Sequence, residues 1–387
     1  MEVSLMASRL YSTTRRLYIQ IACCLGQLVI AEVGTPTTAA LIALYMTGLV
    51  LLDVRQTQTR VTRFLPGRCH DALNRLLRVM PFSTRALMTL VTRWLKRQGW
   101  TGYLCLDDVI VEKAYAKKLP WAGWTYSFAK KRKVYGLHIV VLLWSSVDSH
   151  WRIPIAFRIL RPKRSCAKHD YRTKLQLAEQ MLKEVVGAGL AFEYIVFDTH
   201  YTAGWLTKTM GRLSLIWQGT LDPKTIVIWR GKRLKVSELA KMLRLKWRGS
   251  LGVRAVALRV FAPKYGEIRL VVTRNSHGNY EYIVSNDLWA DLSTLVQRKH
   301  SRWSIETIFR DTKQFAGLEA CQCWVDQAMV RHVALVMMTF VVLQMMRAKP
   351  DKSVGEIKEW WQLQAIRNGE LPPPPLKACP THLRPTA

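Results

Sequence analysis

The spacing of apolar and polar residues changes near residue 101, and each pattern predicts a different kind of structure. From residue 1 to about 100, apolar residues recur at helical spacing with basic side chains between them. This pattern predicts a helical N-terminal region, residues 1–100. Within it, Arg55–Met80 forms two helical pieces separated by Leu65-Pro66-Gly67, because proline and glycine interrupt helices.

The Arg55–Met80 segment has two interpretations. Arginines decorate both pieces, and the second piece has an apolar face. A helix-turn-helix unit that reads DNA would have these properties. The alternative is a basic helical bundle that only touches phosphates.

Residues 101–221 change to the pattern of a mixed α/β domain. Strand-like apolar runs occupy Tyr103–Val111, Val134–Ser145, Trp151–Leu160, Phe192–Asp198 and Leu215–Gln218. Two segments between the later runs, Tyr171–Val186 and Tyr201–Leu213, have helical periodicity. Three strands followed by helix, strand, helix and strand predict a mixed sheet with helices.

Residues 222–286 interrupt this order. Their short β-type runs are Ile226–Trp229, Val253–Phe261, Ile268–Thr273 and Tyr280–Ser285, with turn residues between them. We therefore expect a β-rich insertion. Residues 287–348 return to helix and complete the α/β domain, and residues 349–387 form a C-terminal segment. Its last part, from residue 371, is proline-rich, which predicts a disordered tail.

The charge narrows the class of partner. The chain has 58 Lys and Arg residues against 27 Asp and Glu residues, a formal net charge of +31. Such an excess destabilises a compact protein through self-repulsion unless a polyanion neutralises it. The composition therefore points to nucleic acid or an anionic membrane, and a basic protein without a polyanionic partner is the remaining alternative.

Three uncharged stretches test the membrane alternative. Leu17–Ala31, Gly34–Leu52 and Val333–Met346 each hold fewer uninterrupted apolar residues than the about 20 of a membrane-spanning helix. We interpret them as buried helices and expect no membrane partner. The eight cysteines include no CxxC pair, so we expect neither structural zinc nor a disulfide framework. The expected location is the bacterial cytoplasm, in association with the nucleoid.

Two aspartates end apolar runs of the α/β region. Asp107 follows Tyr-Leu-Cys-Leu, and Asp198 follows Tyr-Ile-Val-Phe. A carboxylate at the end of a buried strand costs desolvation free energy unless it is paired or metal-bound. Sheets of α/β proteins bind their ligands at such carboxyl ends. For each aspartate alone, a turn cap or a salt bridge to lysine is the alternative.

A helical segment supplies a third acid. Arg302, Glu306 and Lys313 stand at i, i+4 and i+11, which places them on one stripe of a helix. Ile305 and Phe309 lie beside this stripe and predict that the helix packs against the protein. Taken alone, Arg302 and Glu306 are equally consistent with an ordinary salt bridge on a solvated face.

Together, Asp107, Asp198 and Glu306 offer three carboxylate ligands for divalent ions. Mg²⁺ prefers oxygen ligands and keeps positions open for water and phosphate oxygens. A pair of such ions can activate water and stabilise the leaving oxygen in phosphodiester cleavage. The acids and the basic charge therefore indicate a metal-dependent enzyme that acts on nucleic acid.

The order of strands, acids and final helix resembles the RNase H-like fold of DDE transposases, over roughly residues 50–345. Arg302, Glu306 and Lys313 match the R-(3)-E-(6)-K signature of the insertion-sequence-four group, whose members also carry a β-rich insertion before the glutamate. The resemblance implies that Asp107, Asp198 and Glu306 are catalytic residues that bind two Mg²⁺ ions, for which Mn²⁺ can substitute. It also implies that Arg302 and Lys313 hold DNA phosphates.

The implied activity is that of a transposase. Such an enzyme binds the ends of an insertion sequence in double-stranded DNA, cleaves them and joins the 3′-hydroxyl ends to target DNA, here as an expected homodimer. Two positions depart from the family pattern. Lys299 stands where the signature has tyrosine and is expected to meet a phosphate instead. The first aspartate is doubled, and Asp107 is preferred to Asp108 because it directly follows the apolar run.

Two other functions stay open on the sequence. An RNase H-like nuclease or resolvase would cut DNA without strand transfer, and the β-rich insertion and basic helical N-terminal region count against it. A catalytically silent DNA-binding protein has no need of the three acids and two cations, which are all in place.

Overall fold

The computed structural model describes residues 11–52, 69–116, 118–127, 130–148, 150–347 and 352–371. The predicted helix break at Leu65-Pro66-Gly67 lies outside these residues, and so does the proline-rich tail from residue 372. The second piece of the predicted DNA reader is helix α5 (Cys69–Arg78), which is followed by α6 (Thr84–Gln98). The domain boundaries drawn from the sequence stay a prediction.

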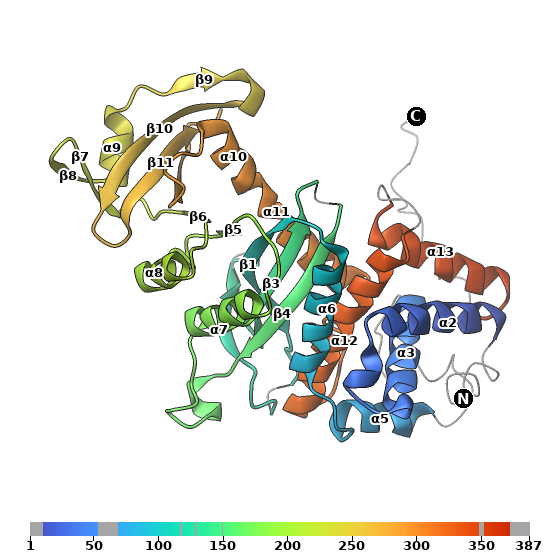
Figure 1. Ribbon diagram of the computed structural model, residues 1–387. Helices are drawn as coiled ribbons and strands as arrows, with labels where there is room; N and C mark the ends of the chain where they lie inside the picture. The colour runs from blue at the N-terminus through green and yellow to red at the C-terminus, as the bar shows by residue number, and fades with distance from the viewer. Residues whose placement is uncertain are drawn as a thin grey trace, which may run out of the picture.

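A bundle of helices confirms the helical N-terminal region (Figure 1). It contains α2 (Ser12–Gln27), α3 (Pro36–Leu51), α5 and α6, together with α12 (Asp326–Met345) and α13 (Val354–Arg367) from the other end of the chain. α3 is apolar around almost its whole circumference because α2, α5, α12 and α13 surround it. Glu370, just beyond α13, accepts hydrogen bonds from the N–H groups of Thr13 and Thr14 at the start of α2.

The uncharged stretches that the sequence predicts as buried helices coincide with α2, α3 and α12. In the described part of the chain, α12 alone is long and apolar enough to cross a membrane. However, 89% of its most apolar window is buried inside the protein, where it packs against β4, α3 and α5. This burial is typical of a core helix.

The first part of the chain's sheet is antiparallel on one side and parallel on the other. Its strands are β1 (Gly102–Glu112), β2 (Gly123–Ser127), β3 (Arg132–Ser146), β4 (Arg152–Leu160), β5 (Ile195–Phe197) and β6 (Trp217–Thr220). β4, β3 and β1 are antiparallel neighbours, and β5 and β6 continue the sheet parallel to β1. This is the predicted mixed order. The prediction misses β2, because the sequence of this edge strand has no apolar run.

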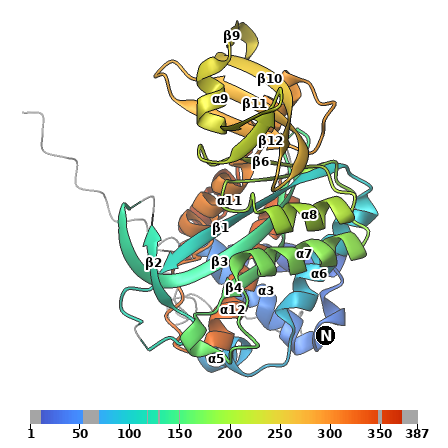
Figure 2. The ribbon, with the colours of Figure 1, turned by 90° about the vertical axis from the view of Figure 1, so that its left-hand side faces the viewer.

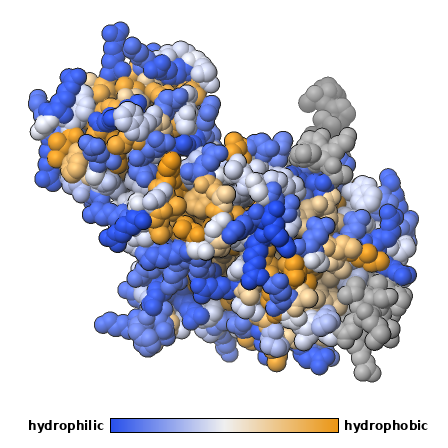
Figure 3. Space-filling model, in the orientation of Figure 1, coloured by the Kyte–Doolittle hydropathy of each residue, from blue (hydrophilic) through white to orange (hydrophobic). Residues whose placement is uncertain are grey.

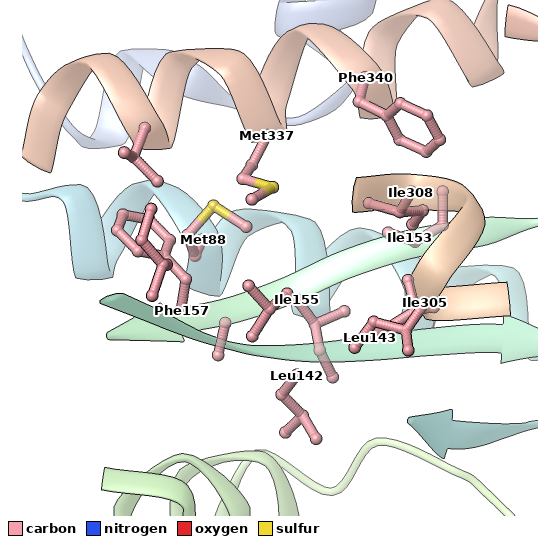
Figure 4. Packing of buried hydrophobic residues seen from close by; sticks show 14 of the residues in the cluster. Met88, Leu142, Leu143, Ile153, Ile155, Phe157, Ile305, Ile308, Met337 and Phe340 are labelled. Carbon is pink, nitrogen blue, oxygen red and sulfur yellow. The ribbon is translucent and has the colours of Figure 1, made fainter. Parts of the chain in front are cut away.

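Helices cover both faces of β3 and β4. α7 (Lys174–Gly187) contacts both strands, and α6, α11 (Trp303–Gln314) and α12 contact β4. In Figure 4, Leu143 points toward Ile305 of α11, and Leu142 points to the opposite side of the sheet. Strands buried on both faces have apolar residues at consecutive positions, which explains the long apolar run in β3.

The predicted β-rich insertion is present and continues the main sheet (Figure 2). Its elements are β7 (Ile226–Trp229), β8 (Lys232–Lys235), α9 (Val236–Met242), β9 (Lys246–Arg248), β10 (Val253–Ala262), β11 (Gly266–Arg274) and β12 (Tyr280–Ser285). β12 pairs with β6, so the order is β2-β3-β1-β5-β6-β12-β11-β10-β7-β8, with β4 on β3 and β9 on β10. The predicted fold class, an α/β mixed sheet with a β-rich insertion and a helical N-terminal region, is confirmed.

Candidate active site

Asp107 lies within the central strand of the first half of the sheet. β1 pairs with β3 on one side and with β5 on the other, and its parallel register with β5 matches Leu106 to Phe197. The next positions along the two strands are Asp107 and Asp198. The register therefore brings the two predicted aspartates next to each other at the end of β5.

The proximity of the two aspartates changes the acidity of Asp107. Burial, and after it the negative charge of Asp198, raise the pKa of Asp107 from 3.8 to about 7. At neutral pH this carboxyl therefore holds a proton for part of the time. A cation bound between the aspartates would favour the ionised form.

Arg302 links Asp107 to the third predicted acid. It lies between α10 (Leu292–Ser301) and α11. Its Nη1 donates to Asp107 Oδ2 at 2.9 Å, and its Nη2 donates to Glu306 Oε1 one turn along α11. Burial disfavours the charged guanidinium, but the carboxylates of Asp107 and Glu306 outweigh burial and raise the pKa of Arg302.

Two local features hold these acids in place. Ile305 and Ile308 are fully buried, so α11 is fixed against the protein with Glu306 on its half-exposed side. Asp198 Oδ1 accepts hydrogen bonds from the N–H groups of His200 at 2.9 Å and Tyr201 at 3.3 Å. Asp198 is thus also a turn residue, as the alternative interpretation had it.

Asp108 has different surroundings from Asp107. Its carboxylate accepts hydrogen bonds from Lys174 Nζ at 3.0 Å and Tyr201 Oη at 2.8 Å, and it also pairs with His138 Nε2. Burial opposes its ionisation, but His138 and Lys174 outweigh burial and lower the pKa of Asp108. Burial and the Asp108 charge raise the pKa of Tyr201.

The sequence interpretation missed the three partners of Asp108. His138 lies within the apolar run of β3, Lys174 begins α7, and Tyr201 lies between Asp198 and α8 (Gly204–Arg212). The polar residue inside an apolar strand run was a usable signal for His138. Lys174 and Tyr201 gave none, because only the packing of α7 and the β5–α8 loop brings them to β1.

The predicted phosphate-binding lysine Lys299 lies close to the acids. A cavity of about 120 Å³ is lined by residues of β5, β6 and β12 and by Asp198, Lys299 and Arg302. Lys299 Nζ donates to both carboxylate oxygens of Glu281, at 2.7 and 2.5 Å. A phosphate that met Lys299 would therefore compete with Glu281.

Lys313 also has partners within the protein. Its Nζ donates to the Ile110 carbonyl oxygen at 2.8 Å and pairs with Glu319 at 2.9 Å. The bond to Ile110 ties the end of α11 to the strand that carries Asp107. Arg310 pairs with Asp311 rather than with Glu306. The phosphate contacts assigned to Lys299, Arg302 and Lys313 stay predictions.

The donor set suits a hard divalent cation. Asp107, Asp198 and Glu306 supply only carboxylate oxygens, and a cation would relieve the repulsion between Asp198 and Asp107 that helps to raise the pKa of Asp107. Within the described ranges, no group of three His, Cys, Asp or Glu side chains is arranged to hold a metal ion. Arg302 bonds to both Asp107 and Glu306. Binding of a metal by all three acids therefore stays a prediction, and it requires Arg302 to release a carboxylate.

Comparison with protein families gives a match over more than half of the chain. The family model of the DDE superfamily endonuclease matches residues 28–237 of 387. The matched range contains Asp107 and Asp198 and ends before Glu306. No curated protein matches the sequence.

Solved structures show a likeness in fold. The piggyBac transposase, in a synaptic complex with hairpin DNA, has 14% sequence identity and a TM-score of 0.50, over 84% of this chain and 70% of that chain. At this identity the likeness shows the fold alone. The NurA nuclease from Sulfolobus solfataricus has 10% identity and a TM-score of 0.28, over 60% of this chain and 85% of its own. This TM-score is too low to indicate a shared fold.

Proposed function

The chain belongs to the DDE superfamily endonuclease family, and on that premise we propose that it is a DNA transposase. It binds the ends of an insertion sequence, cleaves the DNA there and joins the 3′-hydroxyl ends to target DNA. One observation carries the proposal: Arg302 bonds to Asp107 and Glu306 at once, with Asp198 beside Asp107. Acids far apart in the sequence thus meet in one site of a strongly basic protein.

The residues of the site have distinct tasks in this proposal. Asp107, Asp198 and Glu306 hold divalent ions, Mg²⁺ or Mn²⁺, and bound ions of this kind activate water and stabilise the leaving oxygen of a phosphodiester. Arg302 keeps the buried carboxylates of Asp107 and Glu306 neutralised before DNA and metal bind. Its guanidinium then turns to a DNA phosphate, for which it has matching geometry.

The finer assignment is to the insertion-sequence-four group. The spacing of Arg302, Glu306 and Lys313 on α11, and an insertion between Asp198 and Glu306, support it. Lys299 in place of the tyrosine is the departure, and its position beside Arg302 in the cavity next to Asp198 suits a phosphate contact. A homodimer in the DNA complex and a nucleoid location are further parts of the proposal.

A strand-transfer assay tests the function. The donor is a plasmid that carries this gene with its natural flanking DNA, and the target is a second plasmid, with Mg²⁺ or Mn²⁺ present. Joined products are expected. Cutting without joining would instead indicate a nuclease or resolvase, and binding without cutting would indicate a catalytically silent DNA-binding protein.

The variant Glu306→Gln tests the site. It removes one negative charge and leaves the shape of the side chain, so DNA binding should persist while cleavage falls by about a hundredfold or more. Glu359→Gln on α13 is the matched control, because Glu359 is exposed and lies outside the site. Equal loss of binding and cleavage in Glu306→Gln would show that the acid is structural.

A further inference from the structure

Two paired glycines lie in the wall of a cavity beside the edge strand β2. Gly123 and Gly136 face each other in the β2–β3 pair and line a cavity of about 160 Å³. A Cβ at Gly136 would lie 2.3 Å from the Val111 carbonyl oxygen, so no side chain fits there. Gly136 therefore allows the close approach of the β1 backbone, and a Cβ at Gly123 would make an ordinary contact with Pro162 at 3.4 Å.

Aromatic and cationic side chains form the rest of the wall. Arg161 lies over the ring of Trp121 at 4.2 Å, and Lys163 lies over the ring of Tyr171 at 5.3 Å. Trp124 on β2 is 67% exposed at the same cavity. Alternating cations and aromatic rings are the chemistry of grooves for single-stranded nucleic acid, where rings stack on bases and cations meet phosphates.

The cavity continues into a second, larger one. This second cavity, of about 500 Å³, shares Trp121 and Arg161 with the first and lies between β4, α6, α7 and α12. The two cavities together are lined by five Lys or Arg side chains, Arg85, Arg158, Arg161, Lys163 and Arg172, and by one acid, Asp170.

Some of these cations are already neutralised and others are not. Arg85 and Arg158 both pair with Glu184. Arg161, Lys163 and Arg172 make no salt bridge with any described carboxylate. They lie on or beside the connection between β4 and α7, which projects at the lower left as a hydrophilic surface in Figure 3. The positive charge available to a ligand is thus concentrated on the β4–α7 connection.

The inner end of the groove is next to the candidate acids in the chain but on the other face of the sheet. His138 lines the first cavity and pairs with Asp108. Because consecutive residues of a strand point to opposite faces, Asp108 faces the groove side of β1, and Asp107 faces Arg302 on the other side.

We propose that this groove, between β2–β3 and the β4–α7 connection, binds an unpaired single strand of DNA. Its bases stack on Trp124 and neighbouring rings, and its phosphates meet Arg161, Lys163 and Arg172. Duplex DNA keeps its base faces stacked inside the helix, so the aromatic wall would gain nothing from it. The inference extends the proposed transposase function. It depends on that function only for where the single strand comes from, namely the DNA that the enzyme acts on.

Binding measurements with EDTA, which prevents cleavage, test the groove. The probe is a fluorescein-labelled mixed-sequence oligonucleotide, used as a single strand and annealed to its complement, with fluorescence anisotropy as readout. Trp124→Ala should weaken single-strand binding about tenfold, and Lys163→Ala should weaken it several-fold. Duplex binding should change less in Trp124→Ala. The controls Trp360→Ala and Arg367→Ala, both on exposed positions of α13, should bind like the wild type.

Crosslinking places the strand directly. The same oligonucleotide carrying 5-iodouracil should, after irradiation, attach to peptides that contain Trp121, Trp124 or Tyr171. Two results would contradict single-strand binding in the groove. One is crosslinks confined to other peptides, and the other is equal weakening of single-strand and duplex binding in Trp124→Ala. If the wild type joins DNA ends but these tests fail, the groove alone is wrong. If the groove crosslinks but the wild type neither cuts nor joins DNA, the proposed function alone is wrong.

Discussion

At the scale of single residues, the paired aspartates of β1 show how one strand can hold two acids whose pKa values shift in opposite directions. Asp107 shares its site with Asp198, and its pKa is raised to about 7 by burial and by that neighbour. Asp108, one residue on, has a cationic partner in Lys174, and its pKa is lowered. The sequence alone favours Asp107 only by its place after the apolar run. The structure adds an independent physical reason, because Asp107 is the one bonded to Arg302.

Arg302 links two of the candidate acids. It pairs with the carboxylates of Asp107 and Glu306, which would otherwise repel each other. Its side chain is only partly buried, so solvent reaches it. By bonding to both acids, Arg302 keeps their side chains in fixed positions.

A matched pair of substitutions on α11 tests the helix signature. Lys313 bonds to the Ile110 carbonyl on β1, whereas the Arg310 side chain is 59% exposed and pairs only with Asp311 among described residues. Lys313→Ala should therefore reduce DNA cleavage about tenfold or more, since it loses both a phosphate contact and the tie to the strand of Asp107. Arg310→Ala should change cleavage less than threefold, because an exposed pair contributes at most about 1 kcal/mol.

The readouts for this pair are single-turnover cleavage and thermal unfolding. The melting temperature of Lys313→Ala should fall modestly, because the Ile110 carbonyl loses its donor and Glu319 loses its partner. If Arg310→Ala abolished cleavage and Lys313→Ala were silent, the match of α11 to the R-(3)-E-(6)-K spacing would be coincidence.

At the scale of elements, strands with strong apolar runs are predictable and polar ones are not. The ranges predicted for β1, β3, β4, β10 and β11 agree with the structure to within a few residues. β8 and β9 have sequences rich in Lys and Arg, so periodicity gives no signal for them. The sequence also does not predict which strands pair: β12 joins β6 through residues 63 to 67 positions apart in the chain.

The residues of the candidate site are also predictable where they lie next to apolar runs and not where they lie in polar segments. Asp107, Asp198 and Glu306 are found because acids next to apolar runs are conspicuous. Lys174 and Tyr201, two partners of Asp108, come from a helix start and a loop, whose position depends on packing. The helix predicted to carry Glu306 and Lys313 is α11, and Arg302, the first residue of the stripe, caps its N-terminus.

Buried Lys358 on α13 joins two helix ends and gives a stability prediction. Its Nζ donates to the Leu52 carbonyl at the end of α3, at 2.8 Å, and to the Phe315 carbonyl at the end of α11, at 2.7 Å. Lys358→Met keeps the approximate length of the side chain but removes the charged donor that joins the two carbonyls. The free energy of unfolding should fall by about 2–4 kcal/mol. Urea unfolding of the variant against exposed Lys241→Met, which should cost less than about 0.5 kcal/mol, measures the effect.

His332 on α12 predicts a pH dependence of stability. It is fully buried between Tyr45 of α3, which bonds its Nδ1, and the Gly317 carbonyl. Burial, and after it the charge of Lys113, lower the pKa of His332 from 6.5 to about 3. Between these values the unfolded chain binds a proton that the folded protein excludes. The stabilisation is therefore complete above pH 6.5 and is lost as the pH falls toward 3.

The variant His332→Gln removes this titration and keeps a neutral donor and acceptor. The wild type should exceed it in free energy of unfolding most at pH 7, and the difference should shrink by at least about 1 kcal/mol by pH 5. Urea unfolding across this range is the measurement. Exposed His169→Gln should leave the pH dependence as in the wild type. A difference independent of pH would show that His332 has the same pKa in the folded protein as in the unfolded chain.

At the scale of the whole molecule, one sheet connects the candidate active site with the β-rich insertion. β1 and β5 hold the candidate acids, and the same sheet continues through β6 and β12 into the insertion (Figure 2). Hydrogen-bonded strands transmit position more rigidly than a flexible linker. The insertion and the candidate acids of β1 and β5 are therefore connected by one continuous sheet.

The net charge of +31 predicts strongly salt-dependent DNA binding. Each phosphate neutralised by Lys or Arg releases counterions, so log K should fall with log salt with a slope of about −0.9 per contact. We expect a slope of about −5 or steeper for duplex DNA, which corresponds to six or more contacts. Anisotropy titrations between about 50 and 200 mM salt in EDTA measure it. Glu306→Gln should give the wild-type slope, because it adds no phosphate contact. A slope near −1 would mean that the excess charge is spread over surfaces that DNA does not touch, and that the partner of this basic protein is a different polyanion.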